Sequence, residues 1–204
     1  MGLFDATGRA AFRILRRHLG WWKAISVGWA VSRREGRGEP FHDLPAAEDE
    51  RETQSRAQIG PAILLFSELS ERLGDGPALR ITAEVVEIGA HVFLNSVIGR
   101  LDRATLDALD DEARDRFVRE KLSRFPNATV RIEHVGAREV RFTVMSCRFV
   151  RLCRDAGVPE LAPLFCAGDA SFFGGVEPDV VLLRDETLAA GGRCCPFTLR
   201  FRDE

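Results

Sequence analysis

Apolar residues recur with helical spacing through much of the first half of the chain. Residues 55–74 and 77–99 each place apolar side chains three or four positions apart, which is typical of helices with one buried face. Residues 103–125 are more highly charged but keep the same period. The pattern therefore predicts three successive helices, the first of which should end at Gly74 or Gly76.

The period of the pattern changes to two after these helices. Residues 128–135 and 139–146 alternate apolar and polar side chains on either side of a three-residue turn, which predicts an antiparallel hairpin. Two helical stretches and then two strand-like stretches follow, at residues 147–157, 159–173, 179–186 and 195–201. The order predicts an α+β fold: N-terminal helices, then an antiparallel sheet of about four strands, with helices inserted between the hairpin and the last two strands.

The N-terminal segment is basic and rich in tryptophan. We expect a basic amphipathic helix in residues 1–38, a linker rich in Gly, Pro and charge over 39–54, and an α+β domain over 55–204. The helix could lie on an anionic membrane surface, or it could dock on its own domain or on a second subunit. Docking is the commoner fate of such helices, and either contact would be made through residues 9–34.

The charge distribution limits the partners of the protein. Residues 1–38 hold eight Lys and Arg against two acidic residues, whereas the rest of the chain holds 21 against 29. No basic stripe with interleaved aromatic residues continues beyond the first segment, so we expect no nucleic acid and a small-molecule partner instead. We find neither a secretory signal nor an uncharged apolar run of about 18 residues, and expect a cytoplasmic protein.

All the cysteines lie in the last third of the chain. They are Cys147, Cys153, Cys166, Cys194 and Cys195. An odd number without a signal peptide predicts free thiols. Cys147 follows a predicted strand and opens a helix, where the helix dipole favours a thiolate. Cys195 alternates with Phe197 and Leu199, so it should be buried on the apolar face of the last strand.

Cys166 and Asp169 are three positions apart on a predicted helix, so their side chains can touch. Taken alone, such a pair is more often a buried thiol beside a solvated carboxylate than a reactive site. No sequence motif for zinc is present, although Cys147, Cys166, Cys195 and Asp169 could converge in the fold. His91 could line a pocket, but a satisfied core histidine is the commoner case.

Read in order, the C-terminal motifs resemble those of the L-2-amino-thiazoline-4-carboxylic acid hydrolase family. That family shows a Cys at the end of a strand, an F-C-x-x-D helix, an R-x-x-T-L-A-x-G-G turn and a Cys-x-Phe in the final strand. These motifs fall on Cys147, Phe165, Cys166, Asp169, Arg184, Thr187, Leu188, Ala189, Gly191, Gly192, Cys195 and Phe197. Pro196 stands where members often have an acidic residue.

The resemblance implies a hydrolase that opens a small cyclic amidine such as 2-aminothiazoline-4-carboxylate to N-carbamoyl-cysteine. The ring carbon C2 lies between sulfur and nitrogen, so hydrolysis needs a nucleophile at C2 and a proton for the departing group. Cys166 could attack C2 as a thiolate while Asp169 moves protons, or Asp169 could activate water directly. Both residues are therefore candidate catalytic groups.

The other motif residues are expected around the substrate. Arg184 is a candidate for binding the substrate carboxylate, because a guanidinium grips a carboxylate bidentately. Thr187, Cys147 and Cys195 are further candidates for substrate binding. The resemblance leaves open whether the protein works without a cofactor or holds a single zinc-like metal through Cys147, Cys166 and Cys195.

Two other functions use the same residues. The C-x-x-D spacing is similar to the constellation of alkylmercury lyases, in which thiolates hold a soft metal and a carboxylate delivers a proton. Alternatively, the domain is a non-catalytic, sensor-like module that binds a ligand or a metal in a cysteine-lined pocket. Fold-level likeness does not decide between these functions.

Overall fold

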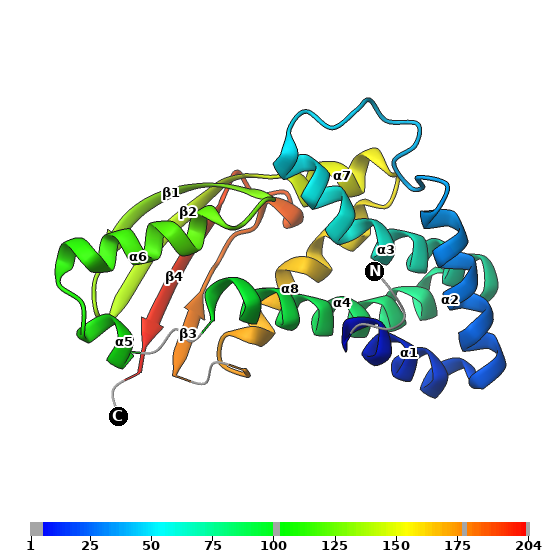
Figure 1. Cartoon of the computed structure of the whole chain (residues 1–204), viewed down its shortest axis with the longest axis horizontal. Helices are drawn as coiled ribbons and strands as arrows, with labels where there is room; N and C mark the ends of the chain where they lie inside the picture. The colour runs from blue at the N-terminus through cyan, green and yellow to red at the C-terminus, as the bar shows by residue number, and fades with distance from the viewer. Residues whose placement is uncertain (1–5, 100–102, 177–178, 203–204) are drawn as a thin grey trace.

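The computed structural model describes residues 6–99, 103–176 and 179–202, and it joins a group of helices to one open sheet (Figure 1). The helices are α1 (Ala6–Leu19), α2 (Trp21–Glu35), α3 (Glu50–Leu73), α4 (Asp75–Ile98), α5 (Arg103–Asp107), α6 (Asp111–Ser123), α7 (Arg148–Asp155) and α8 (Ala162–Phe172). The strands are β1 (Ala128–Val135), β2 (Glu139–Cys147), β3 (Val180–Leu183) and β4 (Cys195–Phe201). Two 3-10 turns complete the set, η1 (Pro159–Leu161) and η2 (Leu188–Ala190).

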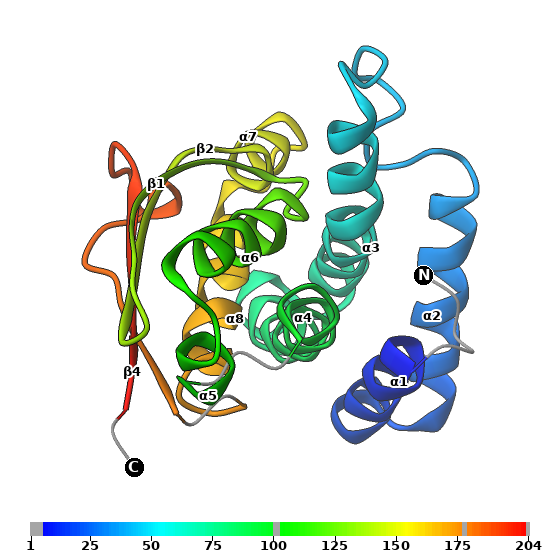
Figure 2. The ribbon, with the colours of Figure 1, turned by 60° about the vertical axis from the view of Figure 1, so that its left-hand side comes forward.

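The sheet has the order β1-β2-β4-β3, and each neighbouring pair is antiparallel. In the hairpin, Val130 pairs with Val144 and Ile132 with Phe142, so the predicted apolar positions share one face. Figure 2 shows α6 and α8 on the side of the sheet that faces the other helices. The predicted α+β fold, with helices inserted between the hairpin and the last two strands, is confirmed.

The charged stretch 103–125 contains two helices, α5 and α6, where the period had predicted a single one. The break is stabilised by Asp110, whose side chain accepts a hydrogen bond from the Ala113 N–H at 2.8 Å. An Asp at this position satisfies one of the unpaired N–H groups at a helix start. Gly74 ends α3 with a positive φ of 80°, as predicted.

The N-terminal segment also forms two helices where one was predicted. Gly20 separates α1 from α2 with a φ of 79°, a conformation that glycine adopts without steric cost. Helix α1 packs against α4, and α2 packs against α3. The side chains of Ile14 and Val27 enter the same core as residues of α3, α4 and α7. Glu84 on α4 also binds Arg17 of α1.

Helix α3 begins at Glu50, inside the segment that was predicted to be a linker. Asp49 caps it by accepting a hydrogen bond from the Glu52 N–H at 2.7 Å. The Glu52 side chain is buried and paired with Arg56 and with Arg151 of α7. These ion pairs keep the pKa of Glu52 low in spite of its burial. They join the start of α3 to the helix that follows β2.

Helix α4 lies at the centre of the helical part of the molecule. It packs against α3, α8 and α1. By length and composition it is long and apolar enough to cross a membrane, alone among the helices of the described chain. The core helix of a water-soluble fold meets the same criteria, so length and composition alone do not assign α4 to a membrane.

Candidate active site

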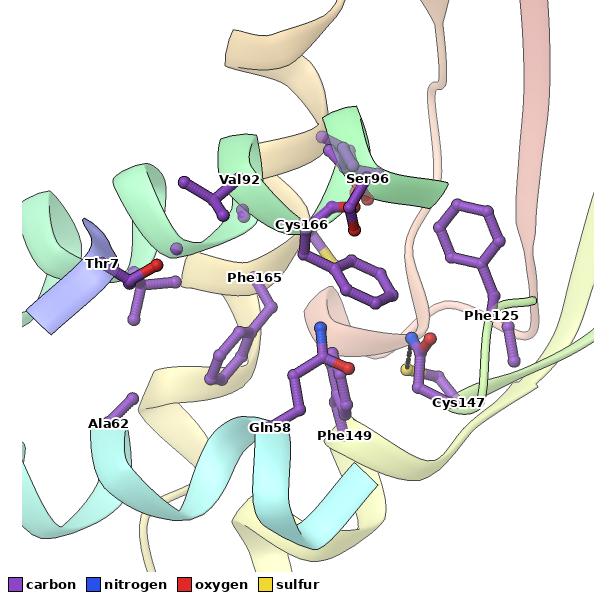
Figure 3. A pocket seen from close by; sticks show the side chains of 18 of the residues that line it. Thr7, Gln58, Ala62, Val92, Ser96, Phe125, Cys147, Phe149, Phe165 and Cys166 are labelled. Atoms are coloured by element: carbon purple, nitrogen blue, oxygen red, sulfur yellow. Dashed lines mark hydrogen bonds between the residues drawn. The ribbon is translucent and has the colours of Figure 1, made fainter. Parts of the chain in front are cut away.

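A cavity of about 640 Å³ is lined by α1, α2, α3, α4, α8 and the sheet (Figure 3). Its volume falls within the range of roughly 300–1,000 Å³ that is usual for ligand pockets. The cavity-lining residues include five of the six predicted site residues: Cys147, Cys166, Asp169, Arg184 and Cys195. The fold therefore brings together residues that are spread over about 50 positions of the sequence.

Helix α8 carries Cys166 and Asp169 to the cavity because it lies very close to α4. The intervening Gly168 is buried, and a Cβ atom at this position would lie only 2.5 Å from the Cβ of Ala90. Real Cβ atoms do not approach so closely, so the contact requires glycine. The C-x-G-D spacing thus combines a close helix contact with two side chains that reach the cavity.

Asp169 forms an ion pair with Arg184 at the edge of the cavity. Arg184 Nη1 donates to Asp169 Oδ2 at 3.0 Å, and Nη2 donates to the backbone oxygen of Cys166 at 2.7 Å. The guanidinium also lies over the ring of Phe197, 4.9 Å from its centroid. With only 8% of its side chain exposed, Arg184 is fixed in place by these contacts.

The surroundings of Asp169 suit a general base. Burial raises the pKa of its carboxyl from 3.8 to about 6, while the charge and hydrogen bond of Arg184 act in the opposite direction. The carboxylate is therefore the main form at neutral pH, yet its pKa lies close enough to 7 for it to accept a proton. A group of this kind is effective in proton transfer near neutral pH.

Cys166 is in the opposite situation. Burial raises the pKa of its thiol to about 12, and the negative charge of Asp169 adds to this shift while Arg184 opposes it. Cys166 is consequently a neutral thiol at physiological pH. Since the thiolate is the nucleophilic form, this environment does not favour the predicted thiolate attack.

Cys147 lies at the end of β2 and precedes the first residue of α7, as predicted. Its Sγ atom accepts a long hydrogen bond from Asn127 Nδ2 at 3.8 Å, drawn in Figure 3. The other end of this amide, Asn127 Oδ1, is buried and has no hydrogen-bond partner, and Asn127 also lines the cavity. No motif pointed to Asn127, because it precedes a strand without any distinctive spacing.

Cys195 is the first residue of β4, and Thr187 belongs to the turn that leads into this strand. Cys195 is buried, as predicted, and its Sγ accepts the Leu188 N–H at 3.2 Å. Burial raises the pKa of the Cys195 thiol above its usual value, and the hydrogen bond from Leu188 offsets part of this rise. Thr187 Oγ1 accepts the Ala190 N–H at 3.1 Å. Thr187 is not among the cavity-lining residues, so it holds the turn instead of reaching the cavity itself.

The glycines of the R-x-x-T-L-A-x-G-G motif have a conformational role. Gly191 has a φ of 89°, and a Cβ at Gly192 would lie 2.3 Å from the Cγ of Glu186. The Glu186 carboxylate in turn accepts the Arg193 N–H at 2.5 Å. The turn is thus compact, and it delivers Cys195 to the cavity.

The described residues contain no group of three or more His, Cys, Asp or Glu side chains that could hold a metal ion. Cys147, Cys166 and Cys195 line one cavity without forming a ligand set. His91 pairs with Ser171 Oγ at 2.7 Å and is not among the cavity-lining residues. This agrees with the expectation of a satisfied histidine.

The chain belongs to the L-2-amino-thiazoline-4-carboxylic acid hydrolase family, whose model matches residues 51–199. Helices α1 and α2 lie outside the match. No curated protein matches the chain. A solved structure from work on heme distortion in the H-NOX family shares 16% identity over 95% of this chain and 92% of that chain, with a TM-score of 0.34.

A second solved structure, from work on heme redox potential and protein-induced porphyrin distortion, shares 15% identity over 95% of this chain and 96% of that chain. Its TM-score is 0.33. Both scores are too low to extend the fold or the ligand of those proteins to this chain.

Proposed function

We propose that the protein is a hydrolase that opens a small cyclic amidine related to 2-aminothiazoline-4-carboxylate, with Asp169 as the general base for an attacking water. Family membership supports the reaction class. The observation that carries the mechanism is the contrast between the two candidate catalytic groups. Asp169 has a pKa of about 6, whereas Cys166 has a pKa of about 12.

The proposed reaction has two stages. Asp169 takes a proton from a water molecule as the water oxygen bonds to C2 of the ring, and the carboxyl group passes this proton to the ring nitrogen. The tetrahedral intermediate then collapses: the C2–S bond breaks, sulfur leaves with the electron pair, and the hydroxyl proton moves to sulfur. The product is N-carbamoyl-cysteine, and the two protons of the water are accounted for.

Arg184 acts mainly through Asp169 in this proposal. Its hydrogen bond fixes the orientation of the carboxylate, and its charge keeps the pKa of that group from rising further in a buried site. Both ends of the guanidinium are already engaged. Binding of the substrate carboxylate by Arg184 remains a prediction. It would require the guanidinium to interact with this carboxylate and with Asp169 at the same time.

The substrate position is suggested by an unpaired polar atom in the wall of the cavity. An amidine carries N–H donors, and the buried Asn127 Oδ1 is an acceptor without a partner in the cavity wall. Leaving such an acceptor buried and unpaired is costly. We propose that Asn127 accepts a hydrogen bond from the amidine nitrogen, while Cys147 and Cys195 form part of the wall.

The test is direct conversion of 2-aminothiazoline-4-carboxylate by the purified protein, with N-carbamoyl-cysteine identified by mass spectrometry. We expect turnover by the wild type and by Asp185→Asn, which alters an exposed carboxylate next to Arg184. Asp169→Asn should lose roughly 10²–10⁴-fold in kcat/KM, the usual contribution of a general base. A lack of turnover with every cyclic amidine tried would reject the hydrolase proposal.

A second candidate is the non-catalytic ligand-binding module. The size of the cavity and the neutral thiol of Cys166 favour this alternative, because neither feature requires chemistry. Saturable binding of a cyclic amidine without product formation would support it. The thiolate chemistry of alkylmercury lyases is not favoured, because burial raises the pKa values of Cys166 and Cys195.

A further inference from the structure

The cavity extends well beyond the residues of the proposed reaction. Its lining on α4 runs from Val85 to Ile98, which corresponds to roughly 20 Å of helix at 1.5 Å per residue. In Figure 3, Cys147 and Phe125 lie toward one end of the cavity and Thr7 toward the other. The proposed substrate has a single five-membered ring, so most of the cavity would stay empty around it.

The cavity is apolar along most of its length, and its polar lining residues include Thr7, Ser32, Glu35 and Gln58 as well as those of the proposed site. Asp169, Arg184 and Asn127 belong to the part that holds the cysteines. The larger part is lined mainly by apolar side chains from α1, α2, α3 and α4, including Phe12, Leu15, Val31, Leu65, Val85 and Val86. A ligand that reaches Asp169 and also fills this mainly apolar part would combine a small polar head with a long, largely apolar portion.

We propose that the ligand of this cavity is an amphiphile, whose polar head binds at Asp169 and whose apolar chain lies along α4 toward α1. The identity of the head as a cyclic amidine rests on the proposed function. The binding of the chain does not depend on turnover. Each methylene moved from water to an apolar site contributes up to about fourfold in affinity.

A chain-length series of alkylamidinium ions tests the proposal. These ions offer an amidine head to Asp169 and differ only in their tails, from acetamidine to dodecanamidine. We expect the affinity measured by isothermal titration calorimetry below micelle formation to rise about two- to fourfold per methylene. An affinity that does not depend on chain length would overturn the proposal.

A cavity-filling variant locates the chain. Ala62 on α3 lines the cavity at the end near Thr7, so Ala62→Phe should weaken dodecanamidine binding at least tenfold and leave acetamidine binding unchanged. The matched control is Ala170→Phe, at an exposed position outside the cavity lining. Ala11→Leu fills the same end from α1 and replaces Ala62→Phe if the latter does not fold by circular dichroism. An equal loss of dodecanamidine affinity in Ala170→Phe would contradict this location of the chain.

The two proposals can fail separately. Chain-dependent binding without turnover of any cyclic amidine would reject the hydrolase and keep the amphiphile site. Conversely, the protein could turn over 2-aminothiazoline-4-carboxylate while its affinity for alkylamidinium ions does not depend on chain length. This result would reject the amphiphile site and keep the hydrolase.

A second inference rests on the outer face of α2. Trp22 and Trp29 are 82% and 62% exposed, and Ile25 between them is also exposed. These residues are three and four positions apart, so they share one side of the helix, whereas Ala24 and Val27 on the opposite side are buried. Docking of α2 on the domain therefore leaves its aromatic side uncovered.

Two cations lie next to this tryptophan face, which we define as Trp22, Ile25 and Trp29. The guanidinium of Arg33 lies 5.3 Å from the ring centroid of Trp29, and Lys23 is exposed beside Trp22. Residues 6–35 carry seven Lys and Arg and one Glu. Tryptophan prefers the boundary between water and lipid, and Lys and Arg are attracted to anionic headgroups.

We infer that the tryptophan face binds an anionic lipid surface. The protein should cosediment with vesicles made of equal parts of phosphatidylserine and phosphatidylcholine, and much less with phosphatidylcholine alone. The double variant Trp22→Ser/Trp29→Ser should lose this binding, whereas Met145→Ser, which removes an exposed apolar side chain of β2, should not. A lack of binding to either vesicle would overturn the inference. A dimer in analytical ultracentrifugation that the double variant abolishes would assign the face to a second copy instead.

Discussion

Asp169 and Arg184 form the part of the site whose behaviour can be tested most finely at the level of single residues. In the proposed mechanism the carboxylate of Asp169 is the active form, so kcat/KM should rise with pH and level off above about 6, the pKa of this group. Below this pH the carboxyl is protonated and cannot accept the proton of the attacking water. A profile without this acidic limb would contradict the role of Asp169.

Arg184→Gln should move that limb. Arg184 lowers the pKa of Asp169 through its charge and its hydrogen bond, so removing the guanidinium should raise the pKa and shift the limb of kcat/KM to higher pH. A merely structural role of Arg184 would lower activity at every pH without displacing the curve. Arg193→Gln, at an exposed position of the same turn, is the control and should leave the limb at about 6.

Five of the six site residues predicted from the sequence line the cavity, but the sequence did not reveal how they interact. The motif order pointed to Cys166, Asp169 and Arg184. The pairing of Asp169 with Arg184 depends on the way a strand returns past α8, which no local pattern encodes. Asn127 had no signal at all, since a buried unpaired oxygen is a property of the packed structure.

At the level of elements, the contact between α8 and α4 determines where the site lies. Gly168→Ala would place its Cβ 2.5 Å from that of Ala90, so we expect a loss of about 1–3 kcal/mol in the free energy of unfolding from overpacking. Ala90→Gly in the same chain should recover part of this loss, because it removes the clashing atom. Urea unfolding of the two single variants and the double variant measures the coupling.

Gly89→Ala is the matched control for this helix contact. A Cβ at Gly89 would meet its nearest atom, in Thr7, at 4.0 Å, which is ordinary contact. Its stability should stay equal to that of the wild type or improve slightly, since alanine favours helix more than glycine does. Additive effects of Gly168→Ala and Ala90→Gly would show that the helices do not press on each other there.

Element boundaries were less predictable than element types. The hairpin and its apolar face followed from the alternation of Val130, Ile132, Phe142 and Val144. The break at Gly20 was missed because apolar residues continue with helical spacing across it. Only the left-handed backbone of that glycine ends α1, and a single glycine does not predict such a conformation.

At the scale of the whole molecule, α1 and α2 pack on the family domain and line part of the same cavity. Ile14→Ala should therefore cost about 2–5 kcal/mol in the free energy of unfolding, as expected for a core residue that is only 6% exposed. Ile25→Ala makes the same change at a position that is 43% exposed and should cost less than about 0.5 kcal/mol. Equal effects in chemical denaturation would mean that α1 does not belong to the core.

The cavity itself could not be predicted from the sequence. Its walls come from segments between α1 and β4, so its volume depends on how all of these pack. The sequence indicated the residues of the proposed site because their motifs are local. The sequence did not indicate the long apolar part of the cavity, because the residues of α1 to α4 that line it look like ordinary core positions of amphipathic helices.

The central claim, hydrolysis by a water activated at Asp169, is tested most directly by comparing two variants side by side. The measurement is kcat/KM for 2-aminothiazoline-4-carboxylate at pH 7.5, a value above the pKa of about 6 for Asp169 and far below that of about 12 for Cys166. The account predicts that Cys166→Ala stays within about tenfold of the wild type, while Asp169→Asn loses roughly 10²–10⁴-fold. An inactive Cys166→Ala together with an active Asp169→Asn would contradict it.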